Sequence, residues 1–155
     1  MRTRGSVIIA GVDGSPASVN ALERAFVEAR RRAGSVELVT VWTDLDIRAA
    51  GESRSYRAGH RWAAGAQREA VARASLLCAQ VPPLTGVVAE GDPASVLARA
   101  GAGAACIVLG SSPADSWPAA QDSLRERCTA LASCPVVVVP PPASLTAHAV
   151  VAAAC

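Results

Sequence analysis

Short apolar runs alternate along the chain with stretches in which apolar residues recur at the spacing of a helix. The first run, residues 7–12, is apolar at almost every position, which is typical of a central strand in a parallel sheet. Because helical patterns separate these runs, we predict an α/β fold in which helices cover both faces of a parallel sheet. The five predicted strands are residues 7–12, 36–42, 85–89, 105–109 and 136–139.

The first predicted helix begins with two residues that favour a helix start. Ser15 can accept a hydrogen bond from the first turn, and Pro16 suits the first helical position because no N–H is needed there. The helix is predicted to end at Gly34 and to turn one apolar face toward the sheet. That face consists of Leu22, Ala25, Phe26 and Ala29.

Three further helices are predicted, and their inward faces contain many small residues. One covers residues 63–79, one follows the turn Gly91-Asp92-Pro93, and one covers residues 123–132. The residues expected to face inward are Ala66, Ala70, Ala74 and Leu77 in the first, Val96, Leu97 and Ala100 in the second, and Leu124, Cys128 and Leu131 in the third.

In two segments the apolar residues recur at neither the spacing of a helix nor that of a strand. Residues 43–62 are polar and rich in Gly, Ser and Arg, and we predict a long loop of the kind that is either functional or mobile. Three prolines at 140–142 end the last strand and start an apolar tail. We therefore expect one α/β domain over residues 1–140, followed by a short C-terminal tail at 141–155.

The composition agrees with one globular domain. Of the 155 residues, 51% are hydrophobic and only 3% aromatic, so the core is expected to consist mainly of aliphatic side chains. These values exclude a disordered chain, a collagen and a disulfide-dense mini-protein. Every basic residue is Arg, which excludes a P-loop lysine and a Schiff-base enzyme. We expect no nucleic-acid partner at a formal charge of +2, and no membrane span without a run of about 18 apolar residues.

The cysteines do not follow the spacing of a metal site or of a disulfide framework. Their number is odd, no two form a C-x-x-C pair, and neither histidine is spaced with them as a zinc ligand would be. Without an export signal at the start, we expect a cytoplasmic protein with reduced thiols and no bound metal. Cys106 and Cys134 are expected to be buried, and an exposed Cys155 could cross-link dimers. The five are Cys78, Cys106, Cys128, Cys134 and Cys155.

Two segments are candidates for a ligand site. The segment at Gly11, Val12 and Asp13 lies at the carboxyl end of the first strand, and open α/β sheets bind ligands at the carboxyl ends of their strands. An equally good interpretation is that Asp13 only shapes the turn. The second segment leaves a strand at Gly110 and returns at a predicted helix start near Asp122, where free N–H groups suit a phosphate. An Asp at the N-cap would itself accept those hydrogen bonds.

Aromatic and basic residues nearby have two interpretations each. Trp42, at the end of the second strand, either lines a pocket or covers the sheet. Trp62 and Trp117 either close over a ligand or belong to the core, which we favour. The arginines of the polar segment either reach a phosphate or keep the loop soluble, and again we favour the second interpretation. They are Arg54, Arg57 and Arg61.

Five motifs in order carry a family resemblance, and together they are far more specific than any one of them. The chain resembles the universal stress protein family over about residues 5–140. The motifs are Val-Asp-Gly-Ser-Pro at 12–16, Val-Thr-Val at 39–41, Gly-Asp-Pro at 91–93, Ile-Val-Leu-Gly-Ser at 107–111 and Ser-Cys-Pro-Val-Val-Val-Val at 133–139.

The resemblance implies an open, doubly wound sheet of strand order 3-2-1-4-5 and a homodimer, often formed through the last strand. In one branch of the family, ATP is held by a Gly-x2-Gly-x9-Gly-Ser/Thr loop, by an Asp after the first strand and by a Val at the end of the second. Carried over to this sequence, these residues are Asp13, Val41, Gly110 and Ser123, beside Gly11 and Val12 in the first turn.

This sequence departs from that loop at two glycines. The second glycine is replaced near Pro113, which lacks an N–H, and the third by Asp122, which brings a negative charge toward the phosphates. Arg125 could offset part of that charge. We therefore expect weak or lost adenine-nucleotide binding. The alternative is a genuine ATP-binding protein that uses the same pocket with ATP and Mg²⁺.

The predicted function is that of a cytoplasmic, regulatory or protective homodimer that is not an enzyme. No nucleophile–base pair, metal cluster or paired carboxylates can be identified, so no catalytic residues are assigned. A nucleotidyl-transferring or flavin-carrying relative is disfavoured because the His-x-Gly-His and Ser-Gly-Gly-x-Asp-Ser signatures are missing. The dimer is expected to form through the strand at Val136–Val139, since an uncharged, β-branched edge strand invites pairing.

Overall fold

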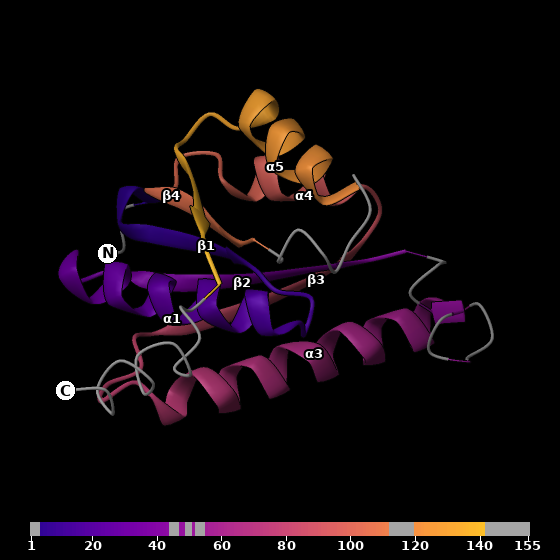
Figure 1. The fold of residues 1–155 in the computed structure, drawn as a ribbon, viewed down its shortest axis with the longest axis horizontal. Coiled ribbons are helices and arrows are strands. Elements are labelled where there is room, and N and C mark those ends of the chain that lie inside the picture. The colour runs from indigo at the N-terminus through magenta and orange to yellow at the C-terminus, as the bar shows by residue number, and fades with distance from the viewer. Residues whose placement is uncertain (1–3, 44–46, 49–50, 52–54, 112–119, 142–155) are drawn as a thin grey trace, which may run out of the picture.

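A computed structural model describes residues 4–43, 47–48, 51, 55–111 and 120–141, with backbone only for Arg4 and residues 120–123 (Figure 1). A short 3₁₀ turn, η1, precedes the first strand, and strands and helices alternate from there on. The elements are η1 (Arg4–Ser6), β1 (Val7–Gly11), α1 (Pro16–Arg31), β2 (Ser35–Trp42), α3 (Tyr56–Leu76), β3 (Leu84–Glu90), α4 (Pro93–Ala100), β4 (Cys106–Gly110), α5 (Ala120–Leu131) and β5 (Val136–Val139).

The five strands form one parallel sheet in the order β3-β2-β1-β4-β5, so the predicted fold class and strand order are confirmed. In the central strand, Ile8 lies opposite Val36 of β2 and opposite Cys106 of β4. Ile8, Ile9 and Ala10 are all buried, because helices cover both faces of the sheet at this strand.

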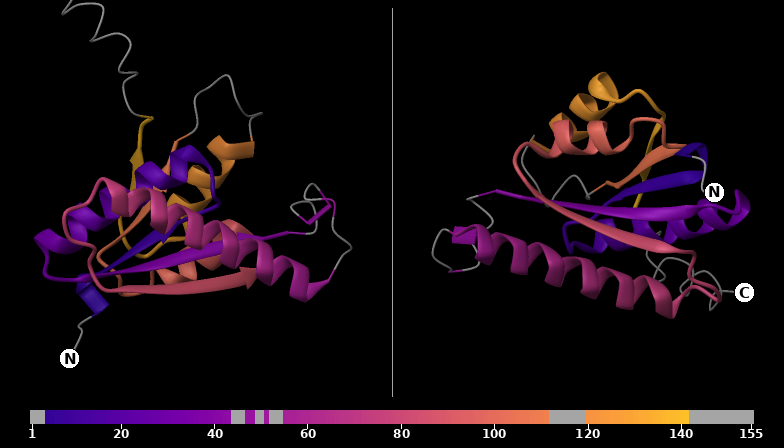
Figure 2. Two further views of the ribbon diagram at one scale, coloured as in Figure 1. Left: turned by 90° about the horizontal axis from the view of Figure 1, so that it is seen from below. Right: turned by 180° about the vertical axis from the view of Figure 1, so that it is seen from behind.

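Alternate side chains of β1 belong to two separate hydrophobic cores, one on each face of the sheet. Ile8 and Ala10 pack with residues of α1 and α3, whereas Ile9 packs with residues of α4 and α5. These two pairs of helices lie on opposite faces of the sheet (Figures 1 and 2). Since successive side chains of a strand point to opposite faces, one short apolar run supplies both layers. The predicted inward face of α1 is confirmed, and all four of its residues are buried: Leu22, Ala25, Phe26 and Ala29.

The prediction of a loop throughout 43–62 is wrong for its last part. The Ser55 hydroxyl accepts a hydrogen bond from the Ala58 N–H at 3.1 Å, and α3 begins at Tyr56. At Gly59 a Cβ atom would lie only 2.2 Å from the indole of Trp42, so this glycine lets the helix approach the sheet. The buried side of this helix start consists of small residues, which gives no strong hydrophobic period.

Two leucines predicted to face inward are exposed instead. Leu77 is 78% exposed because α3 ends at Leu76 and the next residue leaves the helical phase, while Cys78 packs against the core. Leu131, the last residue of α5, is 54% exposed, and the neighbouring Ala132 packs against the core in its place. Helical periodicity is thus a poor guide in the last turn.

Candidate functional site

The carboxyl ends of β1, β2 and β4 meet at one edge of the sheet. Ala10 of β1 lies opposite Val108 of β4 and opposite Leu38 of β2. Past the end of β1, the Val12 N–H donates to the Val39 carbonyl at 3.0 Å. The chain leaves β1 toward one face and β4 toward the other, which makes this edge a topological switch point, the usual place for a ligand in an open α/β sheet.

Asp13 shapes the turn that follows β1. Its side chain is exposed, and Oδ1 accepts a hydrogen bond from the Ser15 N–H at 2.9 Å. The Ser15 hydroxyl in turn accepts from the Ser18 N–H at 3.2 Å, as predicted for the cap of α1. The structure therefore supports the turn-shaping role of Asp13 directly.

The two valines of the candidate site face opposite layers. Val12 is 3% exposed and belongs to the core beneath α1, so only its backbone is available at the edge. Val41 is half-buried and packs against the core beneath α4, near the end of β2. Of the two, Val41 is the side chain that a ligand at this edge could contact.

Gly110 has a structural reason to be glycine. A Cβ atom there would lie 2.0 Å from the carbonyl oxygen of Ala17 in the first turn of α1, so β4 and α1 can pack only without a side chain at this position. At Gly11 a Cβ atom would lie 2.7 Å from a methyl group of Leu109. Close packing therefore accounts for glycine at both positions, and a bound phosphate is not needed to explain them.

Ser123 and Asp122 lie in the first turn of α5, which begins at Ala120. The prediction of a helix start at Ser123 with Asp122 as its N-cap is therefore wrong, since Asp122 is the third residue of the helix. Pro113 lies outside the described residues. No glycine follows Gly110 anywhere in the sequence.

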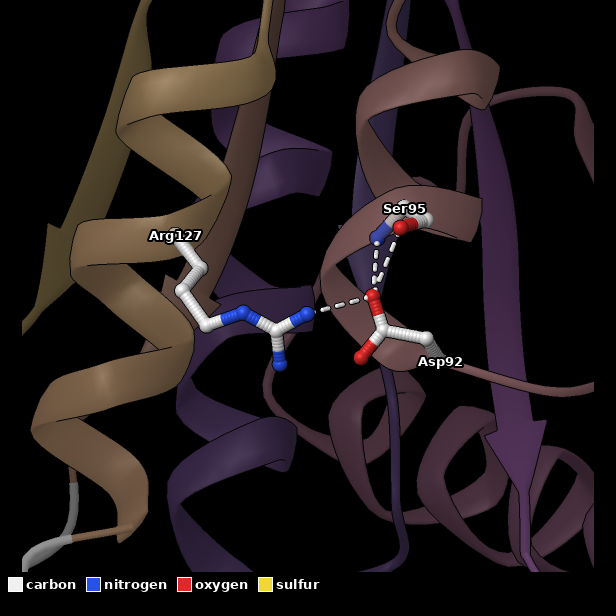
Figure 3. Close-up of polar contacts among 3 residues, drawn as sticks. All are labelled: Asp92, Ser95 and Arg127. Carbon is white, nitrogen blue, oxygen red and sulfur yellow. Dashed lines mark hydrogen bonds and ion pairs between the residues drawn. The ribbon is translucent and has the colours of Figure 1, made fainter.

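A polar cluster that the sequence analysis missed joins α4 to α5 close to this edge (Figure 3). Oδ2 of Asp92 caps α4 by accepting from the Ser95 N–H at 3.0 Å and from the Ser95 hydroxyl at 2.6 Å. The same oxygen accepts from Nη2 of Arg127 at 2.8 Å. These hydrogen bonds, first from Ser95 and then from Arg127, lower the pKa of Asp92. The turn at Asp92 before this helix was predicted, but Arg127 is too distant in sequence to be identified by spacing.

Trp42 does not line a pocket beside Val41. The two residues are neighbours in β2 and therefore point to opposite faces. Trp42 is 2% exposed, lies against Gly59 and has its ring centroid 5.9 Å from that of Tyr56. Trp62 packs partly buried in the same cluster, as favoured from the sequence. Trp117 and Arg54 lie outside the described residues.

The buried cysteines are apolar core residues. Cys106 and Cys128 are buried, and burial raises the pKa of both thiols, while Cys134 is half-buried with its thiol pKa raised for the same reason. A thiol with a raised pKa is a poor nucleophile at neutral pH. In the described part of the chain, no three His, Cys, Asp or Glu residues gather as a metal site would need.

Two shallow cavities lie away from the carboxyl edge. One, of about 210 Å³, lies between α1 and β5 and includes Glu28 and Val137 in its lining. The other, of about 320 Å³, lies between the end of α1 and the segment that leads into β3. Among the helices that the structure describes, none has the length and apolar character to cross a bilayer.

Comparison with known proteins decides the family. The sequence model of the universal stress protein family matches residues 6–140. This chain belongs to the universal stress protein family. The resemblance carried by the five motifs is thereby confirmed. No curated protein sequence matches the chain closely enough to add a named relative.

Solved structures of universal stress proteins have the same fold at low sequence identity. A universal stress protein in complex with cAMP is 21% identical, with a TM-score of 0.63, over 87% of this chain and 97% of that one. A family member from Burkholderia pseudomallei is 24% identical, with a TM-score of 0.58, over 90% and 99%. UspA from Lactobacillus plantarum is 21% identical, with a TM-score of 0.55, over 88% and 98%.

Proposed function

We propose that this universal stress protein is a cytoplasmic, regulatory or protective homodimer that binds adenine nucleotides weakly or not at all, and that it is not an enzyme. The observation that carries the proposal is the lack of any glycine after Gly110. Of a Gly-x2-Gly-x9-Gly-Ser/Thr loop, only the first glycine and the final hydroxyl residue, Ser123, are kept. Close approach of a phosphate to the backbone is favoured by glycine, so the other positions lose that contact.

Asp122 gives an electrostatic reason for the same conclusion. It precedes Ser123 in the first turn of α5, where N–H groups without helical partners would otherwise favour an anion. Two like unit charges 4 Å apart repel by about 4 kcal/mol at an effective dielectric constant of 20. A third of that repulsion would weaken phosphate binding roughly tenfold.

The alternative is an ATP-binding protein that uses this edge with Mg²⁺. It is supported by the position of Asp13, Val41 and Gly110 at one edge of the sheet. It is also supported by the similar structure in complex with cAMP, a ligand that contains an adenine base. In this alternative, Asp13 and Val41 hold the nucleoside, and Gly110 and Ser123 hold the phosphates.

Calorimetric titration of the purified protein with ATP and Mg²⁺, and separately with cAMP, distinguishes the two functions. The preparation is first checked for nucleotide carried through purification. Our proposal predicts no heat, or a dissociation constant near roughly 1 mM. Binding at micromolar concentration would establish the alternative.

Replacing Asp122 by Gly tests the electrostatic argument separately. We expect Asp122→Gly to tighten ATP binding about tenfold, because it removes a charge and restores a glycine in one step. Asp122→Asn serves as the control that removes only the charge. If neither variant binds ATP more tightly than the natural protein, the repulsion argument is wrong.

The dimer is proposed to form through β5. This edge strand carries four valines and no charge, and Val137 is 37% exposed. Among the described residues β5 pairs only with β4, so its other backbone edge and the exposed Val137 suit pairing with a second copy. We expect Val137→Lys to give a monomer in light scattering, whereas the exposed Val87→Lys on β3, at the opposite edge, leaves the dimer intact. A dimeric Val137→Lys protein would place the interface elsewhere.

A further inference from the structure

An exposed apolar surface lies at the end of α3, at the amino-terminal edge of the sheet and thus opposite the candidate nucleotide site. Leu76 is 85% exposed and Leu77 is 78% exposed, and Val81 in the segment before β3 is 42% exposed. Single exposed apolar residues are common, but here three lie within six residues of sequence, and a concentration of exposed apolar side chains is typical of an interaction site.

A groove of about 320 Å³ adjoins this patch, between the C-terminal end of α1 and the segment before β3. Two of its lining residues, Ala29 of α1 and Pro82, are buried. The volume is at the lower end of the range for ligand pockets, which suits one or two side chains rather than a large ligand. The remaining lining residues are Arg30, Ala33, Gly34, Gln80, Val81 and Pro83.

Positive charge borders the groove. Arg30 lines it, and Nη1 of its guanidinium donates a long hydrogen bond to Sγ of Cys78, at 3.9 Å. Among the described residues, no carboxylate pairs with Arg30. By contrast, Arg32 is paired with Glu28 at 2.7 Å, and Arg73 is paired with Glu69 at 2.6 Å. Arg30 is therefore available to an anionic group from another molecule.

We propose that this surface, defined by Arg30, Leu76, Leu77, Val81 and the groove, binds an acidic, apolar segment of a partner protein. One apolar side chain of the segment enters the groove, and a neighbouring carboxylate pairs with Arg30. A further apolar side chain covers the two leucines. The concave shape favours a protruding peptide side chain over the flat surface of a lipid bilayer.

The proposal does not depend on nucleotide binding or on the dimer. The surface lies at the amino-terminal edge, whereas the candidate nucleotide site lies at the carboxyl edge and the proposed dimer strand is β5. A failure here leaves the proposed function untouched, and calorimetry with ATP would give the same result in every variant of this surface.

The test measures fluorescence anisotropy of three labelled short peptides titrated with the full chain. The first peptide contains Glu and Leu, the second has Lys in place of Glu, and the third has Ala in place of Leu. We expect the Glu–Leu peptide to bind with a dissociation constant of about 100 µM, and the others only above roughly 1 mM. Raising the salt concentration should weaken the binding, because the charges are exposed.

Substitutions on the surface locate the binding. Arg30→Glu is expected to weaken binding of the Glu–Leu peptide about tenfold, and Leu77→Gln about fivefold. The controls make the same changes elsewhere: Arg68→Glu on the exposed side of α3, and Leu131→Gln at the exposed end of α5. Both controls should bind the peptide as the natural chain does, and circular dichroism checks that all four variants are folded.

Several outcomes would overturn the proposal. One is the failure of the Glu–Leu peptide to bind, and another is equal binding of the Lys–Leu peptide. Equal loss of binding in a surface variant and its control would also overturn it.

Binding to mixed phosphatidylcholine–phosphatidylserine vesicles in place of the peptide would overturn the proposal and identify a membrane surface instead. A change of oligomeric state in Leu77→Gln, seen by light scattering without peptide, would identify a second copy of the chain as the occupant.

Discussion

The two helical layers are held to the same sheet in different ways. On one face, α1 and α3 share a continuous apolar core in which Leu22 and Phe26 are fully buried. On the other face, the core under α4 and α5 is smaller, and an exposed ion pair between Asp92 and Arg127 joins the two helices. The first layer therefore depends mainly on packing, although the Gln67 amide of α3 also donates to the Val87 carbonyl of β3 at 2.8 Å. The position of α5, by contrast, depends on an ion pair between two helices near the candidate site.

The largest expected effect is the loss of a large side chain from the first layer. Phe26 is 0% exposed, and Phe26→Ala should lower the free energy of unfolding by about 3–5 kcal/mol, because it leaves a cavity between α1 and the sheet. Urea denaturation measures the change. The neighbouring Val27 is 45% exposed, so Val27→Ala should change stability by only about 0.5 kcal/mol. Equal effects of the two substitutions would contradict the packing account of this layer.

A smaller effect is expected where α1 approaches β4. Gly110→Ala places a methyl group against the Ala17 carbonyl and should cost about 1–3 kcal/mol, with no ligand present. Gly65→Ala is the matched control, because a Cβ atom there meets nothing within 4 Å and the residue lies within α3. The control should be neutral or stabilise the protein by up to about 1 kcal/mol. If Gly110→Ala were equally harmless, this glycine would need a functional explanation.

The first layer could be predicted well because its signals are local. The positions of Leu22, Phe26 and Ala29 follow the helical period, and Ser15 and Pro16 mark the helix start. Ser55 marks the start of α3 in the same way, but the helix start at Tyr56 showed no apolar period. Its inner face is built from alanine and glycine against a tryptophan that precedes it by more than ten residues.

The candidate site could be predicted only in part. Carboxyl ends of parallel strands share an edge, so Gly11, Asp13, Val41 and Gly110 were expected near one another and lie there. Strand alternation would also have placed Trp42 on the face opposite Val41, since the two are adjacent in one strand. The pairing of Asp92 with Arg127 depends on the relative position of two helices, which no spacing in the sequence specifies.

Loss of the contact between Asp92 and Arg127, which joins the two helices of the second layer, should have a smaller effect on stability. Arg127→Gln removes the ion pair but leaves the cap that Asp92 provides to α4, whereas Asp92→Ala removes both. We therefore expect a greater loss of stability in Asp92→Ala than in Arg127→Gln, because exposed pairs contribute little. Hydrogen exchange of the α5 amides should nevertheless accelerate in Arg127→Gln. The exposed Arg99 of α4 provides the control, and Arg99→Gln should leave that exchange unchanged.

The smallest effect is the dependence of this contact on pH. Hydrogen bonds from Ser95 and Arg127 lower the pKa of Asp92 in the folded protein below the ordinary aspartate value of about 3.9. The contribution of Asp92 to stability is therefore fully present above that value and is lost as pH falls through the lowered pKa. The difference in melting temperature between the natural protein and Asp92→Asn should be constant from neutral pH to about pH 5 and should shrink below pH 4. If the difference instead grew at low pH, the folded protein would favour the protonated carboxyl, and Asp92 could not be the ionised link between the two helices.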